Sequence, residues 1–298
     1  MGSMIFHSRK QELFKPIKRS PPMLAVAITQ DGNHALSTGL DFVLRKWDLL
    51  SGKCTHTWEA GGPLNAITVS PDGKWALTST VMGALQWDLK GWQFMRSFLT
   101  YKGGTEDVAY ADKLGMIIGA GEDSLIYRWD IESGEKHKPL ADHKYPISAL
   151  AVVEKDNLLI SGDSSGELRL WDLSSGDCLG SWRAHDSKVT DLAILSQSRQ
   201  VISVSQETLI RTWDLDTGEP LQELSGHTGW IEALAVSKQE NWMLSVGEDG
   251  LRLWDLKNYC DVYSDNSIDI SCLALSTDEK FVVTGGRDGH LSVWPIDL

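Results

Sequence analysis

Cysteine is scarce in this sequence, and its spacing fits neither metal binding nor redox chemistry. The chain has four cysteines and no C-x-x-C pair; they stand singly at Cys54, Cys178, Cys260 and Cys272. Isolated thiols of this kind are typical of proteins in a reducing compartment. The eight histidines show no H-x-x-x-H or His/Cys ligand spacing either. We therefore expect a cytoplasmic protein with no metal site and no cofactor.

Basic residues and long apolar runs are also lacking. The 28 Lys and Arg are outnumbered by 41 Asp and Glu, which gives a formal net charge of −13. This excess repels phosphate backbones, so we expect no nucleic acid partner. No apolar run approaches the roughly 18 to 20 residues that span a bilayer, and the N-terminus has no signal-peptide core. Residues 1–3 (Met-Gly-Ser) are interpreted as a cloning remnant.

Motifs for nucleotide binding are missing as well. The sequence contains no G-x-x-x-x-G-K-[ST] and no G-x-G-x-x-G. We also find no convincing helical periodicity and no linker that would divide the chain. These absences favour a single domain, and we expect it not to be an enzyme.

Tryptophan, in contrast, is abundant and periodic. Seven of the 13 Trp recur at intervals of 40 to 42 residues, at Trp47, Trp87, Trp129, Trp171, Trp213, Trp254 and Trp294. The first six are each followed by Asp, and the last is followed by Pro295. A fixed period in this range indicates a chain of similar supersecondary units.

Each unit is predicted to consist of four short strands. Between Val189 and Asp214, short runs of alternating apolar residues are separated by polar turns, which is the two-residue period of strands. A turn with glycine follows most of the Trp-Asp pairs, as at Ser175-Gly176 and Thr217-Gly218. An apolar residue 11 positions after each of the first five repeat tryptophans, such as Trp182, marks a fourth strand.

These features resemble the WD-repeat family of β-propellers from about Gln11 to the end of the chain. The family also has a His about 27 or 28 residues before its Trp-Asp, found here as His143, His185 and His227. The resemblance implies an all-β fold over residues 4–298: a seven-bladed β-propeller of four-stranded antiparallel blades. Ala60 and Tyr101 stand where two other units would have the His, so those blades are expected to lack its hydrogen bond.

The ring is expected to close with an N-terminal strand. Too few residues follow Trp294 to form the outer strand of the seventh blade, whereas residues 11–17 are long enough. We therefore predict that this segment is the missing strand, in which Pro16 is tolerable because the strand lies at an edge. The alternative is a disordered arm ahead of an incomplete blade.

The resemblance also implies a buried hydrogen-bonded tetrad in three units. In the sixth unit its members are His227, Ser245, Asp249 and Trp254. The fifth unit has His185, Ser203 and Trp213, with Glu207 in place of Asp. The fourth has His143, Ser161 and Trp171 but Ser165 at the carboxylate position, so we expect a weaker or water-mediated version there. A catalytic triad is disfavoured because each Ser lies on a strand inside a blade.

Propellers of this family usually bind partners through the face formed by two sets of loops: those between blades, and the turns between second and third strands. Counting by repeat offset predicts the residues on that face. They include an apolar arc, several carboxylates and one aromatic residue. The candidate partner-binding residues are Trp230, Glu232, Glu248, Glu106, Glu122, Leu24, Leu40 and Val81.

The sequence therefore predicts a non-catalytic interaction scaffold or sensor. Its partner is expected to be a protein or peptide that bears Arg or Lys beside an apolar anchor. There is an alternative for each kind of candidate residue. The acidic residues in the loops could serve only to keep the protein in solution, and Trp230 could fold over its own blade. There are two alternatives to this function: an enzyme that uses the central channel, and a regulatory domain of a larger protein. We expect no membrane partner and a monomer, although the sequence does not fix the oligomeric state.

Overall fold

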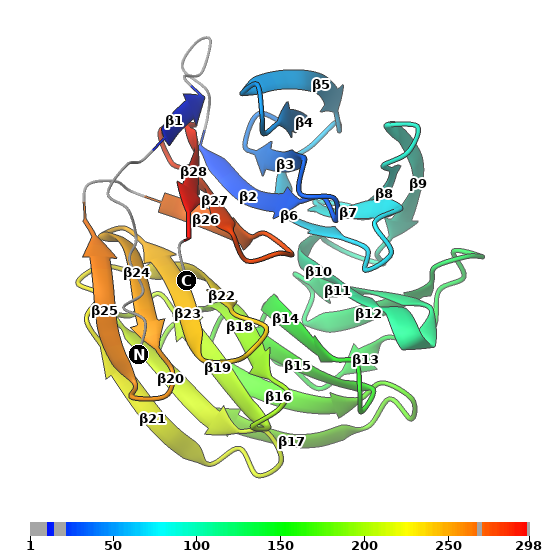
Figure 1. Ribbon diagram of the computed structural model, residues 1–298. Helices are drawn as coiled ribbons and strands as arrows, with labels where there is room; N and C mark the ends of the chain where they lie inside the picture. The colour runs from blue at the N-terminus through cyan, green and yellow to red at the C-terminus, as the bar shows by residue number, and fades with distance from the viewer. Residues whose placement is uncertain (1–10, 15–21, 267–269, 297–298) are drawn as a thin grey trace.

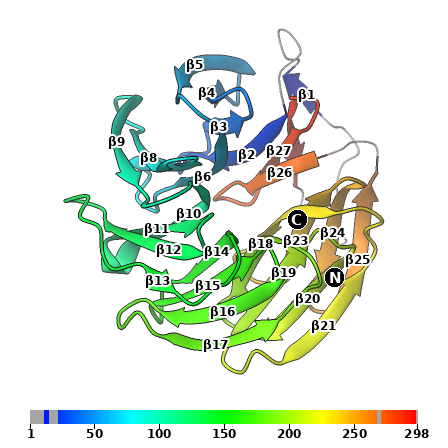
Figure 2. The ribbon, with the colours of Figure 1, turned by 180° about the vertical axis from the view of Figure 1, so that it is seen from behind.

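The computed structural model describes residues 11–14, 22–266 and 270–296. These residues form seven four-stranded antiparallel sheets that follow one another around a ring (Figures 1 and 2). The described part contains one short 3-10 helix, η1 (Asp112–Leu114). No helix in it is long and apolar enough to cross a bilayer. The predicted all-β, seven-bladed propeller is confirmed.

The first four blades each run outward from an innermost strand, in chain order. Blade 1 consists of β2 (Met23–Ile28), β3 (His34–Gly39), β4 (Val43–Asp48) and β5 (Lys53–Glu59). Blade 2 consists of β6 (Leu64–Val69), β7 (Trp75–Thr80), β8 (Gly83–Asp88) and β9 (Gln93–Leu99). Blade 3 consists of β10 (Thr105–Ala111), β11 (Met116–Gly121), β12 (Leu125–Asp130) and β13 (Leu140–Ala141). Blade 4 consists of β14 (Ile147–Val153), β15 (Leu158–Asp163), β16 (Glu167–Asp172) and β17 (Cys178–Arg183).

The remaining blades keep this order except at the closure. Blade 5 consists of β18 (Val189–Leu195), β19 (Gln200–Ser205), β20 (Leu209–Asp214) and β21 (Pro220–Ser225). Blade 6 consists of β22 (Ile231–Val236), β23 (Trp242–Gly247), β24 (Gly250–Asp255) and β25 (Cys260–Asp265). Blade 7 consists of β26 (Ile270–Leu275), β27 (Phe281–Gly286), β28 (Leu291–Pro295) and, outermost, β1 (Gln11–Phe14).

The N-terminal strand closes the ring as predicted. Strand β1 pairs antiparallel with β28, with Gln11 opposite Val293 and Phe14 opposite Leu291. The two strands, at opposite ends of the chain, lie side by side in both views (Figures 1 and 2). The rest of the predicted closing segment, residues 15–17 with Pro16, lies outside the described residues, as do the residues interpreted as a cloning remnant.

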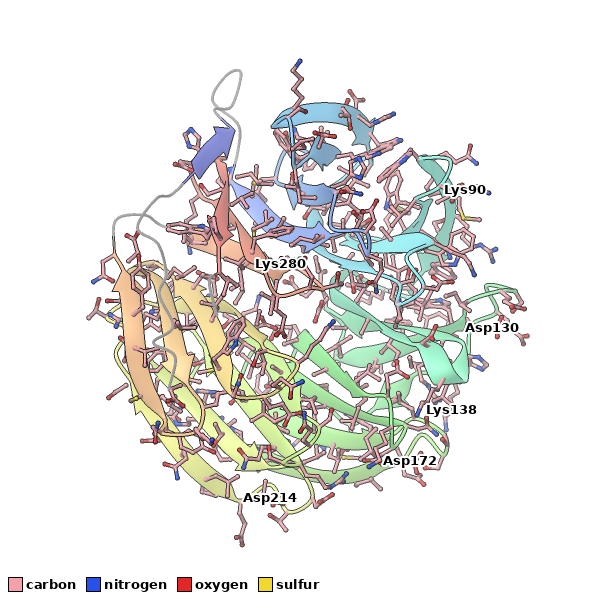
Figure 3. All side chains as sticks on the ribbon, in the orientation of Figure 1. Lys90, Asp130, Lys138, Asp172, Asp214 and Lys280 are labelled. Carbon is pink, nitrogen blue, oxygen red and sulfur yellow. The ribbon has the colours of Figure 1, made fainter. Side chains whose placement is uncertain are left out.

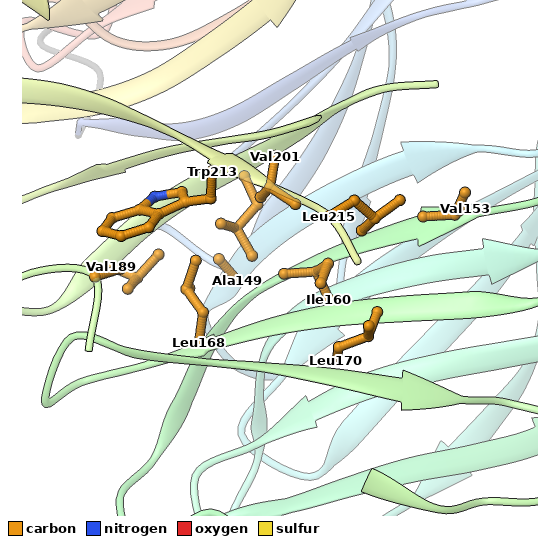
Figure 4. Packing of buried hydrophobic residues seen from close by; sticks show 11 residues of the cluster. Ala149, Val153, Ile160, Leu168, Leu170, Val189, Val201, Trp213 and Leu215 are labelled. Atoms are coloured by element: carbon orange, nitrogen blue, oxygen red, sulfur yellow. The ribbon is translucent and has the colours of Figure 1, made fainter. Parts of the chain in front are cut away.

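The cores lie between blades rather than within them. Seven clusters of buried apolar side chains each join two neighbouring blades. In the cluster between blades 4 and 5, Ile160 and Leu168 pack against Val201 and Trp213 (Figure 4). The sheet of a blade can bury its two faces only against the two neighbouring blades. In blade 5, for example, the second strand β19 is therefore almost fully buried, whereas the outermost strand β21 is mostly exposed.

The Asp after each of the first six repeat tryptophans lies at the turn between the third and outermost strands of its blade. The Oδ1 atom of Asp130 accepts a hydrogen bond from the Ser133 amide at 2.7 Å, and Asp172 and Asp214 make the same contact to their turns. Figure 3 shows these three residues one after another along the rim of the ring. The turn then needs a positive φ, which Gly176 and Gly218 supply, whereas blade 2 places Trp92 there (φ 52°).

Candidate functional site

The tetrad of blade 6 forms as the repeat pattern predicts. His227 bridges the two partners, with Nδ1 2.5 Å from Asp249 Oδ1 and Nε2 2.6 Å from Ser245 Oγ. The Ser245 hydroxyl in turn accepts the indole N–H of Trp254 at 2.8 Å. Burial lowers the pKa of His227, and the hydrogen bond from the imidazole lowers the pKa of Asp249 against the effect of its own burial. The pair is therefore a neutral imidazole on an ionised carboxylate.

The tetrad of blade 5 forms with Glu207 at the carboxylate position. His185 Nε2 lies 2.8 Å from Ser203 Oγ, and its Nδ1 lies 3.3 Å from Glu207 Oε2. Trp213 donates its indole N–H to the same Ser203 hydroxyl at 2.9 Å. A second hydroxyl, Ser205 Oγ, lies 3.0 Å from His185 Nδ1.

Blade 4 contradicts the prediction of a weakened tetrad. His143 Nε2 lies 2.7 Å from Ser161 Oγ, and its Nδ1 lies 2.9 Å from Asp163 Oδ2, a carboxylate two residues before the expected position. Ser165, which the sequence analysis placed there, instead donates to Asp163 Oδ1 at 2.7 Å. Position 163 ends the second strand and faces the imidazole from the same turn, so either place can supply the acceptor. The tetrad of blade 4 is complete and direct.

Each of these polar clusters connects the loop before a blade to the second and third strands of that blade. Ser245 and Ser203 have 0% exposed surface, and each hydroxyl is already engaged by an imidazole and an indole. A nucleophile must reach a substrate, and these hydroxyls cannot. Among the residues that the structure describes, no group of three or more His, Cys, Asp or Glu converges to hold a metal ion.

The mouth of the central channel collects one position from every blade. The residues five positions after the His position, or its equivalent, line a cavity of about 330 Å³. They include three of the predicted partner-binding residues, Leu24, Glu106 and Glu232, and the remaining four are Asn65, Ser148, Thr190 and Ser271. The repeat offset thus identified residues that converge in space from all seven blades.

Two of the predicted carboxylates already have cationic partners within the chain. Lys188 Nζ lies 3.3 Å from Glu106 Oε2, a contact that joins blade 3 to the loop before blade 5. Arg287 forms an ion pair with Glu232, and its Nη2 atom lies 4.0 Å from Glu248 Oε1. The mouth therefore carries its own basic residues, which the sequence analysis did not pair with these carboxylates.

Trp230 is held by its backbone and presents its side chain to solvent. Its carbonyl accepts the Glu248 amide at 3.1 Å, and its own amide donates to Glu248 Oε2 at 3.3 Å. The residue is 46% exposed. A fixed backbone and an exposed indole are what an interface anchor requires, because little ordering remains to be done on binding.

The other predicted residues lie on turns of the first three blades. Leu40 (51% exposed) and Val81 (46% exposed) are on the second-to-third-strand turns of blades 1 and 2. Glu122 is exposed on the corresponding turn of blade 3, where its Oε2 accepts the Gly104 amide at 3.2 Å. Three further exposed residues on the same face were not predicted as partner-binding residues, and their only signal in the sequence is a large hydrophobic side chain in a predicted loop: Phe42, Met82 and Tyr101.

Inside the channel, two carboxylates join neighbouring blades. Asp107 Oδ2 accepts the Leu150 amide of blade 4 at 2.8 Å, and Asp191 Oδ2 accepts the Leu234 amide of blade 6 at 2.8 Å. Burial raises the pKa of Asp107 to about 6 and that of Asp191 to about 7. Both carboxylates lie on innermost strands, β10 and β18, and were not predicted from the sequence.

Seven four-stranded blades, a repeated Trp-Asp turn and His-Ser-Trp tetrads define a WD-repeat β-propeller. The family model described as WD domain, G-beta repeat matches residues 134–172, 176–214, 218–255 and 259–295, more than half of the chain. The chain therefore belongs to the WD40 family. Each matched segment runs from the outer strand of one blade through the first three strands of the next, and together they extend from β13 of blade 3 to β28 of blade 7.

The similar curated proteins match over parts of their length only. A WD repeat-containing protein 26 homolog from Arabidopsis thaliana is 31% identical over 113 residues, which are 35% of this chain and 18% of the relative. The small ribosomal subunit protein RACK1z from the same plant is 37% identical over 65 residues, 22% of this chain and 20% of the relative. RACK1 from Brassica napus is 35% identical over 65 residues, with the same coverage. The chain thus spans about a fifth of the length of these relatives.

Proposed function

We propose that this chain is a non-catalytic protein-interaction module that binds a protein or peptide through its loop face. The loop face comprises the loops between blades and the turns between second and third strands. The observation that carries the proposal is Trp230, an exposed indole on a backbone fixed by two hydrogen bonds to Glu248. Relatives that are named as small ribosomal subunit proteins are parts of an assembly, which supports an interaction role here.

The partner is proposed to carry Arg or Lys beside an apolar anchor. Glu122 faces no cation among the residues described, and Glu248 lies at the outer limit of an ion pair with Arg287. Because Glu106 and Glu232 have basic partners within the chain, the two exposed carboxylates are the better candidates for contact with an incoming cation. Leu40 and Val81 add exposed apolar surface on neighbouring blades.

The proposal is tested by affinity purification with the intact chain and with its Trp230→Ala variant. We expect a specific partner to be retained by the unmodified chain and lost from the variant, while both show the same melting curve. Partners bound equally by both proteins would contradict the role of Trp230.

We propose a cytoplasmic location, which the four free cysteines support.

A further inference from the structure

Blade 2 has apolar residues at the positions where blade 6 has a cluster of polar residues. Counted from the repeat Trp, blades 2 and 6 have the same spacing, so that each member of the blade 6 cluster has a counterpart in blade 2. The pairs are His227 and Ala60, Asp249 and Met82, Arg252 and Leu85, Asp261 and Phe94. The strand register agrees, because Asp261 lies opposite Trp254 and Phe94 lies opposite Trp87.

In blade 6 this cluster fills the space beside the repeat Trp. His227 bonds Asp249, and Arg252 forms ion pairs with both Asp249 and Asp261. In blade 3 two aromatic side chains occupy the positions of the imidazole and the guanidinium. Their rings, those of Tyr101 and Tyr127, lie 5.8 Å apart. The repeat Trp is buried in all three blades: Trp254 and Trp129 are each 1% exposed and Trp87 of blade 2 is 4% exposed.

In blade 2 the corresponding space is open. Ala60 and Leu85 are too small to replace an imidazole and a guanidinium, and a cavity of about 640 Å³ lies there, next to the outer strands β5 and β9. Trp58 of blade 1, Trp87 and Phe94 form its aromatic walls, with ring centroids 6.1 Å apart for the first two and 5.7 Å for the last two. This volume lies within the range of about 300 to 1,000 Å³ that is usual for ligand sites.

The cavity is lined mainly by apolar side chains, together with the hydroxyls of Thr57 and Ser97 and one carboxylate. Phe94 is 51% exposed and Met82, on the adjoining turn, is 64% exposed. Glu59 lines the cavity, and its carboxylate makes no hydrogen bond or ion pair with the residues that the structure describes. The nearby Arg96 does not supply the missing charge, because its Nη1 donates to the Glu132 carbonyl at 2.9 Å. An apolar slot beside a carboxylate without a cation suits a ligand of complementary character.

We propose that this blade 2 pocket binds a polypeptide segment that inserts one bulky apolar side chain, flanked by an Arg or Lys that pairs with Glu59. The site goes beyond the loop-face function, because its walls come from the outer strands of blades 1 and 2 and not from the loops around Trp230. The segment belongs to a protein partner. The experiment distinguishes such a partner from a second copy of this chain.

The test uses a library of random peptides displayed on phage, selected on the intact chain and counter-selected on its Phe94→Asp variant. Phe94 lies on the exposed outer strand β9, so this change should leave the fold intact. We expect enriched peptides to share a bulky apolar residue next to Arg or Lys. Their synthetic versions should bind the variant at least about tenfold more weakly, as loss of an aromatic wall at an anchor pocket implies.

Three control variants make the outcome specific. Leu221→Asp, on the exposed outer strand of blade 5, should bind these peptides normally. Trp230→Ala should also bind them normally, which separates this pocket from the loop face. Glu59→Gln should weaken binding less at high salt than at low salt. Failure to enrich any peptide that depends on Phe94 would overturn the proposal, as would enrichment of acidic peptides or a self-association that Phe94→Asp abolishes.

Discussion

His143 and Asp163 face each other inside blade 4, with Nδ1 2.9 Å from Oδ2 and both side chains almost completely buried. Hydrogen bonds from His143 and Ser165 lower the pKa of Asp163, although its burial acts in the opposite direction. The carboxylate is therefore ionised and shared between an imidazole and a hydroxyl. This relationship restores the tetrad that Ser165 alone could not complete.

Asp163→Ala should destabilise the protein by about 1 to 3 kcal/mol, because it leaves a buried imidazole without its acceptor. Ser165→Ala removes only a donor at the partly buried edge of the turn and should cost about 1 kcal/mol or less. Denaturant unfolding of both variants measures the difference. If Ser165→Ala proved the more destabilising, the assignment of Asp163 would be wrong.

His227→Ala should destabilise by roughly 1 to 3 kcal/mol, since Asp249 and Ser245 each lose a partner. His137→Ala is the matched control, because His137 lies in blade 3 between β12 and β13 and belongs to no tetrad. Its effect on the free energy of unfolding should stay within about 0.5 kcal/mol. Thermal or chemical unfolding compares the two directly. Equal effects would mean that the imidazole of His227 does not stabilise blade 6.

Deletion of residues 4–17 should lower the melting temperature by several degrees and promote aggregation. Strand β1 covers the outer edge of β28, and its loss exposes that edge and opens the ring. Calorimetry and light scattering on the full chain and the shortened chain measure both effects. Superimposable melting curves would show that β1 contributes nothing to closure.

Asp191→Asn should alter how stability depends on pH. Burial raises the pKa of Asp191 to about 7 in the folded state, well above the ordinary aspartate value of 3.8. Between these values the folded chain holds a proton that the unfolded chain has released, so ionisation lowers stability as pH rises from about 4 to 7. The melting temperature of the unmodified chain relative to the variant should therefore fall over this window. A constant difference would place the pKa of Asp191 near its ordinary value.

The fold followed from the sequence because its determinants are local and repeated. Trp213 and Ser203 lie on adjacent strands ten residues apart, and the same contact recurs at the same spacing between Trp171 and Ser161 in blade 4 and between Trp47 and Ser37 in blade 1. The acceptor Asp163 was missed because two positions on one turn can reach the same imidazole, and offset counting chose the other. The loop-face positions were found by the same counting, and their role in binding stays a prediction.

Contacts between distant blades could not be derived in this way. Lys188 and Glu106 are 82 residues apart and meet only because the ring closes around a narrow channel. The blade 2 cavity has the same origin. Ala60 was visible as a departure from the repeat, but the cavity also depends on Trp58 from the preceding blade. Whether such a space is filled depends on the side-chain volumes of two neighbouring blades. The sequence of one repeat gives the residues of only one of them.

The affinity of an isolated partner for the Trp230→Ala variant tests the loop-face proposal most directly. Isothermal titration calorimetry with the intact chain, this variant and Leu221→Ala gives the three dissociation constants. Loss of an indole anchor should weaken binding by about 2 kcal/mol or more, roughly thirtyfold, whereas Leu221→Ala on the outer strand of blade 5 should leave the affinity unchanged. A Trp230→Ala variant that is folded and binds with unaltered affinity would contradict the proposal.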